Sequence, residues 1–407
     1  MRVVAITHRT PFPPDKGDKI RTHHLLTRLA ARCEVHLVAF AEPPDDRAHA
    51  ARLRRAFASV TLVPLDLTVQ KVKALTTLLT RRPLTLSVFD SPRLAAAVDG
   101  LVADLRPEAL FAESTSMAPY ALAHPSVPLV MDFVDVDSAK WAAYAESAPF
   151  PRAQVFRREA ATLRAYEAEV ARKARINVIT APREKALLDA IAPGADVRVL
   201  ANGVDTDYFS PRPAAPEAPS VVFFGAMDYA ANVEAAAWLV ARVLPRLRAR
   251  WPGLTVTLAG SKPTPEVLAL GKTDGVTVTG YVADIRPWVQ GAAVCAIPLR
   301  VARGVQNKVL EAMALGVPVV ASPAAAEGIA ATPGESLSVA PVVDDGRAFA
   351  DAVAALLDHP LRAAEMARAA RAVVTERYGW QPQADALYAL LREAAGVTDA
   401  ARSPAPR

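Results

Sequence analysis

The sequence contains few of the residues that stabilise small secreted proteins. Its 407 residues include only two cysteines, Cys33 and Cys295, each beside or within an apolar run and without a second cysteine nearby. Isolated cysteines of this kind are typical core residues of proteins in a reducing compartment, so we expect neither a disulfide framework nor a cysteine metal site. Aromatic residues make up only 6% of the chain. Alanine and valine dominate instead, which suits packed helices and buried parallel strands.

Long hydrophobic runs are also missing. No stretch reaches the ~18 apolar residues that a membrane-spanning helix needs. The apolar segment Met1–Thr7 is too short to be the core of a signal peptide. The sequence therefore predicts a cytoplasmic protein.

The chain has a modest excess of positive charge. Its formal charge is +5, but acidic residues are interleaved almost everywhere, so the sequence has no basic stripe of the kind that binds nucleic acid. The excess fits an enzyme that binds anionic substrates or contacts anionic lipid head groups at the inner face of the membrane. An ordinary solvated basic surface explains it equally well.

Short β-branched runs alternate with longer amphipathic stretches along the whole chain. In the first half such runs lie at 2–7, 34–40, 59–64, 109–112, 128–133, 176–180 and 197–200. After a proline-rich break at 211–219 the pattern restarts at 220–224, 255–259, 276–279, 293–298, 317–321 and 337–339. Strands that alternate with helices indicate βαβ units and parallel sheets. The sequence therefore predicts an α/β protein with two Rossmann-like, doubly wound domains facing a cleft.

The expected domains follow from this repetition. We expect a first domain over 1–205 and a second domain over 206–378. A last helix within 379–396 is expected to cross back onto the first domain, and residues 397–407 to form a disordered tail.

The stretch from Pro298 to Ser322 carries the clearest chemical signal. It reads as a strand end, a loop containing Arg303 and Gly304, a helix and a second strand. A glycine before a helix N-terminus lets a phosphate approach free backbone amides and the positive end of the helix dipole. The sequence therefore predicts a diphosphate site here.

Polar residues interrupt the apolar surface of the helix that follows. Asn307, Lys308 and Glu311 lie on one side of it. Lys308 can neutralise phosphate, and the Glu311 carboxylate can accept hydrogen bonds from two ribose hydroxyls. The alternative is a surface ion pair between Lys308 and Glu311, which stabilises a helix by only a few tenths of a kcal/mol.

Several motifs resemble those of one enzyme family in content and order. Lys308–Val320 resembles the donor-site signature of GT-B glycosyltransferases of family 4, the glycosyl transferases group 1. Asn202–Pro211, Phe224–Tyr229 and Gly280–Ile285 resemble that family's interdomain segment, the start of its second domain and its base-binding loop. Pro11–Arg21 and Met131–Trp141 resemble bacterial exopolysaccharide and PEP-CTERM/exosortase-associated sugar transferases, and these two ranges narrow the resemblance.

The resemblance implies a GT-B fold in which the domain over 1–205 lies on the acceptor side and the domain over 206–378 binds the nucleotide sugar. It implies a nucleoside-diphosphate sugar as donor substrate, and neither a metal nor another cofactor. It also implies a set of donor-binding residues: Gly17, Gly225, Tyr281, Val282, Arg303, Gly304, Val305, Asn307, Lys308, Glu311 and Glu327. Two positions depart from the family pattern, since Arg303 stands where many members carry a glutamate, and Gly225 is followed by Ala226 and Met227.

The acceptor side is less well marked. Asp132, Asp135 and Asp137 follow a buried strand and could act as a general base, bind sugar hydroxyls or hold a cation. We name Asp135 as the catalytic candidate, beside Lys308 and Glu311. Glu113–Ser116 could line the acceptor pocket, and His8 and Arg9 are weaker candidates.

The sequence thus predicts a glycosyltransferase that moves a sugar, with retention, to a lipid-linked or polysaccharide acceptor in exopolysaccharide biosynthesis. Two alternatives stay open: a GT-B nucleotide-sugar epimerase or hydrolase, and a degenerate GT-B protein that binds nucleotide or glycan as an assembly factor. The donor sugar, the linkage and the oligomeric state do not follow from the sequence.

Overall fold

The computed structural model describes residues 1–14, 17–41, 50–68, 70, 75–212, 218–302 and 305–397. The chain forms two compact units. Unit 1 comprises Met1–Ala201 and the chain from Gln383 on, and unit 2 comprises Asn202–Pro382. A binding cleft between the two units stays a prediction of the sequence.

Unit 1 is built on a parallel sheet whose described part has seven strands in the order β3-β2-β1-β4-β5-β6-β7. The strands are β1 (Arg2–Thr7), β2 (Glu34–Ala41), β3 (Ser59–Pro64), β4 (Ala109–Glu113), β5 (Leu129–Val134), β6 (Ile176–Ile179) and β7 (Val197–Val199). Residues Val3–Ile6 of β1 are fully buried, because helices cover both faces of such a sheet and leave no polar side to alternate with. The strand order reverses between β1 and β4.

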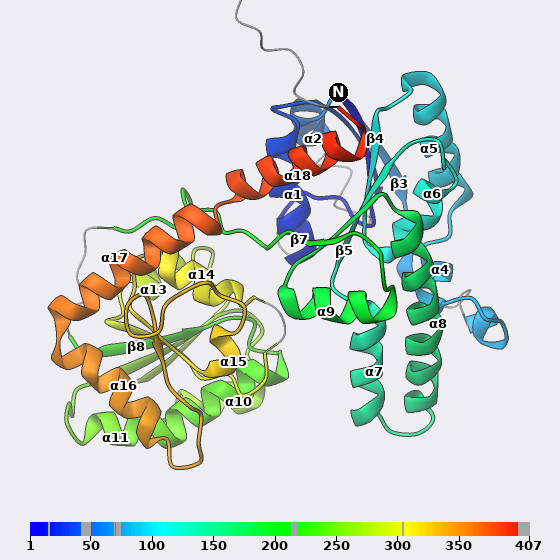
Figure 1. Cartoon of the computed structure of the whole chain (residues 1–407). Helices are drawn as coiled ribbons and strands as arrows, with labels where there is room; N and C mark the ends of the chain where they lie inside the picture. The colour runs from blue at the N-terminus through cyan, green and yellow to red at the C-terminus, as the bar shows by residue number, and fades with distance from the viewer. Residues whose placement is uncertain are drawn as a thin grey trace, which may run out of the picture. The chain divides into compact units, whose positions relative to one another are not determined.

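The helices of unit 1 surround this sheet (Figure 1). They are α1 (Gly17–Leu29), α2 (Ala50–Ala56), η1 (Leu75–Leu79), α4 (Leu84–Val88), α5 (Pro92–Leu105), η2 (Thr115–Met117), α6 (Ala118–Leu122), α7 (Asp137–Ser147), α8 (Arg152–Lys173) and α9 (Pro182–Ile191). The final helix α18 (Trp380–Ala394) begins in unit 2, and its residues from Gln383 on belong to unit 1. Arg198 on the edge strand β7 holds this helix through two hydrogen bonds of 2.6 Å to the carboxylate of Glu393.

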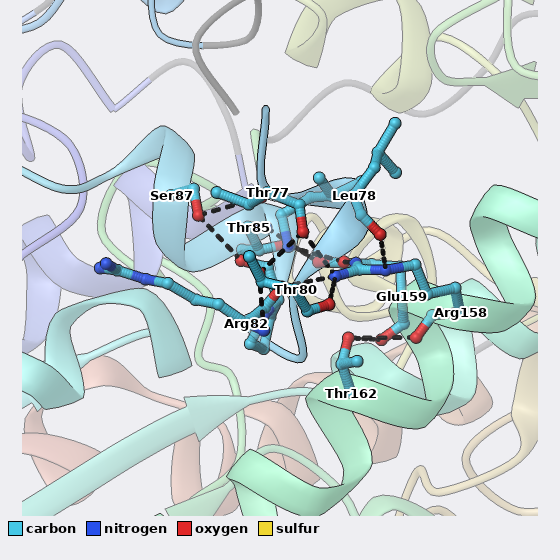
Figure 2. A network of polar contacts seen from close by, with 11 residues as sticks. Thr77, Leu78, Thr80, Arg82, Thr85, Ser87, Arg158, Glu159 and Thr162 are labelled. Atoms are coloured by element: carbon cyan, nitrogen blue, oxygen red, sulfur yellow. Dashed lines mark hydrogen bonds and ion pairs between the residues drawn. The ribbon is translucent and has the colours of Figure 1, made fainter. Parts of the chain in front are cut away.

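Two adjacent residues of α8 fix the segment that precedes α4 (Figure 2). The guanidinium of Arg158 donates hydrogen bonds to four backbone carbonyls, those of Thr77, Leu78, Thr80 and Arg82. The buried carboxylate of Glu159 accepts hydrogen bonds from the backbone amides of Leu84 and Thr85, at 2.7 and 2.8 Å. Pro83 caps α4 without a side-chain hydrogen bond, so Glu159 takes the place of an N-cap residue.

Unit 2 contains a second parallel sheet, in which the described strands have the order β10-β9-β8-β11-β12-β13. The strands are β8 (Ser220–Phe224), β9 (Thr255–Ala259), β10 (Val276–Gly280), β11 (Val294–Ile297), β12 (Val319–Ala321) and β13 (Ser338–Val339). The helices are α10 (Ala230–Trp238), the π-helix η3 (Leu239–Val243), α11 (Leu244–Arg248), α12 (Pro265–Leu270), α13 (Arg286–Gln290), α14 (Asn307–Ala314), α15 (Pro323–Ala326), α16 (Arg347–Asp358) and α17 (Pro360–Arg377). Here the strand order reverses between β8 and β11.

The predicted α/β class with two doubly wound sheets is confirmed. Every predicted strand begins and ends within two residues of an observed one. Ligands of open parallel sheets bind outside the carboxyl ends of the strands, where the order reverses. The two places to examine are therefore the β1–β4 edge of unit 1 and the β8–β11 edge of unit 2.

Candidate donor and acceptor sites

Two glycines shape the carboxyl edge of the unit 2 sheet. Gly225 follows β8 with φ +151°, and Gly260 follows β9 with φ +150°. A Cβ on Gly260 would lie 1.8 Å from the carbonyl oxygen of Gly225, so the two strand ends can approach only as glycines. A Cβ on Gly225 would lie 2.9 Å from Asn232 Nδ2 and 3.1 Å from Lys308 Nζ. The missing side chain of Gly225 therefore leaves room directly beside Lys308.

Lys308 lies in the first turn of α14 and faces this space. Its ammonium group donates a hydrogen bond to Asn232 Oδ1 and lies 5.0 Å from the centre of the Phe223 ring. Burial lowers the pKa of Lys308 to about 8, and the opposing effects of Glu311 and Cys295 do not offset it. Within the described residues no carboxylate forms an ion pair with Lys308, so the alternative of a Lys308–Glu311 surface pair is wrong. The Lys308 ammonium group therefore has no ion-pair partner among the described residues.

Glu311 has the complementary property. Burial raises its pKa to about 7, and Lys308 offsets this only in part. Among the described residues nothing donates a hydrogen bond to its carboxylate. Asn307, one turn earlier on the same helix, has a buried Oδ1 that also lacks a hydrogen-bond partner. Buried polar groups without partners are rare and costly, so this stripe of α14 is suited to a polar ligand.

The loop before α14 lies partly outside the described residues. Arg303 and Gly304 belong to the part of the chain that the structure does not describe, so their roles stay predictions. Gln306 is the N-cap of α14 and provides no side-chain cap, which leaves the first-turn amides without that partner. The side chain of Val305 lies 3.5 Å from the position that a Cβ would take on Gly328, so this loop and the loop after α15 are neighbours.

Tyr378 holds the loop that carries Glu327. Glu327 itself is exposed at the end of α15. The Tyr378 hydroxyl accepts a hydrogen bond from the amide of Ala330 at 2.7 Å and donates one to the carbonyl of Gly328 at 3.3 Å. The backbone carbonyl of Tyr378 accepts a further bond of 2.7 Å from the amide of Val204. Tyr378 therefore joins this loop to the start of the segment Asn202–Pro211.

The same segment is fixed by side chains that the sequence did not single out. Arg371 on α17 donates hydrogen bonds to the carbonyls of Thr206, Phe209 and Ala314. Ala314 ends α14, so Arg371 also satisfies the negative end of this helix. Neither α17 nor its arginine lies near a recognisable motif, and no local signal could have identified them.

Tyr281 and Val282 lie in the loop after β10. Tyr281 is 79% exposed, so its ring is available for stacking on a planar ligand. Asp284, three residues on, accepts hydrogen bonds from the side chain of Arg286, and the Arg286 guanidinium lies 3.9 Å from the centre of the Tyr208 ring. The base-binding role of Tyr281 and Val282 stays a prediction.

In unit 1, His8 lies at the point where the strand order reverses. Its Nδ1 lies 2.7 Å from the Glu113 carboxylate at the end of β4, and its Nε2 lies 3.1 Å from the Asp18 carboxylate in the first turn of α1. Arg9 donates to the same Asp18 oxygen at 2.6 Å. In the sequence Glu113 was a candidate for lining the acceptor pocket, His8 and Arg9 were weaker candidates, and Asp18 was a neighbour of the candidate Gly17. Only the fold brings them together.

The three aspartates after β5 have different environments. Asp132 is buried and forms an ion pair of 2.8 Å with the buried Arg21. The prediction that Asp132 could bind a ligand or act as a base is therefore wrong. Asp135 is exposed and accepts a hydrogen bond of 3.1 Å from Thr180 Oγ1. Burial raises the pKa of Asp137, and the neighbouring Asp135 adds to this effect. The catalytic role of Asp135 stays a prediction.

Gly17 begins α1. A Cβ at this position would meet no atom within 4 Å, so packing among the described residues does not require a glycine here. Its predicted contact with a substrate is untested.

Known proteins share features of this chain. Residues 218–359 match the family model "Glycosyl transferases group 1". The GDP-mannose-dependent alpha-(1-6)-phosphatidylinositol monomannoside mannosyltransferase of Mycobacterium tuberculosis is 34% identical, over 52% of this chain and 59% of that protein. Glycogen synthase of the same organism is 30% identical, over 49% of each chain. This chain thus matches only about half to three fifths of the length of these curated relatives.

Solved structures resemble the whole chain. Sucrose-phosphate synthase from Thermosynechococcus elongatus gives a TM-score of 0.68 at 18% identity, covering 98% of this chain and all of that one. Anabaena Alr3699/HepE in complex with UDP gives 0.66 at 14% identity, covering 97% of this chain and all of that one. The chain has the GT-B fold. At these identities the structural likeness establishes the fold alone.

Proposed function

We propose that this chain is a glycosyltransferase that uses a nucleoside-diphosphate sugar as donor. The observation that carries the proposal is the stripe of Asn307, Lys308 and Glu311 beside Gly225. Among the described residues, Asn307 Oδ1 and the Glu311 carboxylate accept no hydrogen bond, and Lys308 has the neutral side chain of Asn232 as its hydrogen-bond partner and no ion pair. It lies at the switch point of a sheet within the range that matches the glycosyl transferases group 1. The titles of the HepE structures name UDP and UDP-glucose as that protein's ligands, which supports a donor of this class.

The chemistry follows from the ligand that these groups suit. The bond between the anomeric carbon and the diphosphate oxygen breaks, and a bond from that carbon to an acceptor oxygen forms. Lys308 stabilises the negative charge that develops on the departing diphosphate, and Glu311 accepts hydrogen bonds from the ribose hydroxyls. The acceptor hydroxyl loses its proton, and Asp135, the candidate base from the sequence, accepts this proton. The resemblance to family 4 supports retention at the anomeric carbon.

The acceptor is proposed to be lipid-linked or a growing polysaccharide. The phosphatidylinositol mannoside named for the mycobacterial relative supports a lipid-linked acceptor. The link to exopolysaccharide biosynthesis rests on the resemblance of Pro11–Arg21 and Met131–Trp141. Among the described residues no helix is both long and apolar enough to span a bilayer.

Contact with the inner membrane face is supported by the α7–α8 hairpin, whose helices pack side by side (Figure 1). Phe150 at its turn is 79% exposed, and Arg152, Arg157 and Arg164 on α8 are exposed too. Vesicles of phosphatidylglycerol should sediment the wild-type protein at low salt, and Phe150→Ser should weaken this. Leu361→Ser, which alters an exposed side chain of unit 2, serves as the control. Failure to sediment at any salt concentration would contradict membrane contact.

The donor is tested by a thermal-shift panel of UDP-, GDP- and ADP-sugars, since only a ligand that binds the native state raises the transition temperature. Turnover is then measured with and without glycan and polyprenyl-linked acceptors. Acceptor-dependent transfer supports the proposal. Donor consumption without an acceptor indicates an epimerase or hydrolase, and binding without turnover indicates an assembly factor.

A further inference from the structure

A second group of ionisable residues lies at the carboxyl edge of β1, β4 and β5 in unit 1. His8 follows β1, Glu113 ends β4, and Asp137 begins α7 just after β5. The order of the sheet reverses between β1 and β4, which is where ligands of open parallel sheets bind. Nothing in the donor site of unit 2 uses these groups.

His8 is held from both sides. Its two ring nitrogens lie 2.7 Å from Glu113 Oε2 and 3.1 Å from Asp18 Oδ2. Both neighbours are carboxylates, so both nitrogens must donate, and the ring must be an imidazolium ion. No ring nitrogen is left to accept a proton from a substrate. His8 is therefore a cationic brace between two acids and not a general base.

Backbone strain marks the same edge. Ser114, directly after β4, has φ +75°, and Val134, which ends β5, has φ +63°. Non-glycine residues in this region cost about 1–3 kcal/mol each and cluster at functional sites. Glu113 is only 2% exposed, and its second oxygen, Oε1, is buried without a hydrogen-bond partner. Two strained residues, Ser114 and Val134, and one buried atom without a hydrogen-bond partner, Glu113 Oε1, thus lie at the same sheet edge as His8.

The exposure of the side chains indicates which groups meet a ligand. The Glu113 side chain is 2% exposed and that of His8 14%, whereas those of Asp18 and Arg9 are 20% and 28% exposed. The cluster therefore presents one carboxylate and one guanidinium to the outside. Its two cations, His8 and Arg9, face the acids Glu113 and Asp18, and Asp137 lies nearby as a third acid. Because acids outnumber cations, the cluster suits a neutral ligand with hydroxyl groups better than a phosphate.

We propose that this cluster binds a sugar hydroxyl of the acceptor, that the Asp18 carboxylate accepts the hydrogen bond of that hydroxyl, and that His8 is the positioning residue that holds Asp18 in place. This inference rests on the proposed glycosyltransferase function. It adds an acceptor subsite in unit 1 to the donor site in unit 2.

The first test separates acceptor binding from donor binding. His8→Gln and Asp18→Asn are assayed with the donor found active above and with octyl α-glucoside, α-mannoside and α-galactoside as acceptors. We expect KM for the octyl glycoside to rise about tenfold or more, which corresponds to the loss of one good hydrogen bond to a charged group. Nucleotide-sugar affinity should stay within about twofold.

A matched control is available on the neighbouring strand. His36 on β2 is also buried between polar partners, with Nδ1 2.8 Å from Ser59 Oγ and Nε2 3.1 Å from Glu34 Oε1. It lies near the amino end of its strand, away from the carboxyl edge. His36→Gln should therefore change stability without changing either KM.

The second test uses pH. Burial would lower the pKa of His8, but Glu113 and Asp18 outweigh it and raise the pKa to about 9. The charged groups that face the ring are Glu113 from β4, Asp18 from α1 with its partner Arg9, and Asp137 from α7. At saturating donor, kcat/KM for the octyl glycoside should fall as pH rises through about 9. Glu113→Gln should move this fall to lower pH, and His8→Gln should abolish it.

The outcomes are distinct. An unchanged acceptor KM in both variants, or an equal rise in donor KM, overturns the inference, and so does a panel in which no octyl glycoside binds. If His8→Gln does not fold, Asp18→Asn decides, because its side chain is partly exposed. If the wild type turns over no nucleotide sugar, the proposed function fails. The acceptor subsite is then judged separately, by saturation-transfer NMR of the octyl glycosides with the wild type and with Asp18→Asn.

Discussion

The carboxyl edges of the two sheets differ in what sets the pKa values of their charged groups. At the β8–β11 edge of unit 2, the proposed donor site, burial lowers the pKa of Lys308 to about 8 and raises that of Glu311 to about 7, so both groups are pushed toward their neutral forms. At the β1–β4 edge of unit 1, Glu113 and Asp18 overcome burial and raise the pKa of His8 to about 9. His8 and Arg9 in turn hold the pKa of Asp18 far below its usual range, although burial opposes them.

This difference separates two kinds of binding site. The groups of unit 1 are one another's partners, so that edge is organised before a ligand arrives. Among the described residues of unit 2, Lys308 has only the neutral Asn232 as a hydrogen-bond partner and the Glu311 carboxylate has none, so a bound diphosphate and ribose would supply the missing partners. We therefore expect substitutions in unit 2 to affect ligand binding most strongly, and substitutions within the ion pairs of unit 1 to affect stability or geometry.

The largest effect is expected for Lys308→Ala. Removal of the cation at the diphosphate should reduce kcat/KM for the nucleotide sugar by about 100- to 1,000-fold, as is typical when one charge-stabilising group is lost. In the wild type, donor affinity should fall as pH rises through about 8, where Lys308 loses its proton. Lys272→Ala, an exposed lysine of the same unit, serves as the control. Turnover near the wild-type level in Lys308→Ala would contradict the assignment of the donor site to this part of unit 2.

Asp132→Asn is expected to act on stability alone. It breaks the buried pair with Arg21, and an unpaired buried charge costs about 3–5 kcal/mol. Urea denaturation should show this loss, while both KM values of the remaining folded enzyme should stay unchanged.

Asp135→Asn, at an exposed position three residues on, should leave stability unaltered and lower kcat if Asp135 accepts the proton. Equal stability of the two variants would contradict the assignment of Asp132.

The same contrast explains what the sequence could predict. The groups of the proposed donor site lie in one helix, so the spacing of Asn307, Lys308 and Glu311 is enough to place them on one side of it. Strands such as Arg2–Thr7 and Ser220–Phe224 were also predictable, because continuous apolar β-branched runs have few other uses in a soluble α/β protein.

The unit 1 cluster could not be predicted in this way. His8 and Glu113 are separated by about a hundred residues, and only the pairing of β1 with β4 brings them together. Asp132 looked like its neighbours Asp135 and Asp137 in sequence, and it differs only because Arg21 on α1 reaches it. The hold of Tyr378 on the Gly328–Ala330 loop is likewise a long-range contact without a motif.

Glu311→Gln should stabilise the unliganded protein at alkaline pH. The native pKa of about 7 lies above the ordinary 4.5, so the native state binds this proton more tightly and loses stability as pH rises between these values. A neutral glutamine removes that loss, with a gain of up to about 3 kcal/mol at pH 8 that shrinks toward pH 4.5. Glu266→Gln, at an exposed position, should show no such pH dependence. Destabilisation at pH 8 would mean that the folded protein already provides a partner for Glu311.

The smallest effect is expected for Tyr378→Phe, which removes only the hydroxyl that holds the Gly328–Ala330 loop. The lost hydrogen bonds should cost about 1 kcal/mol of stability. Because Gly328 of this loop lies beside Val305 and follows Glu327, KM for the nucleotide sugar should rise about three- to tenfold with little change in kcat. Tyr388→Phe is the control, since the Tyr388 ring contacts Arg32 and Arg392 in unit 1. A rise in acceptor KM instead would show that Tyr378 acts on unit 1. It would contradict the separation of donor binding in unit 2 from acceptor binding in unit 1.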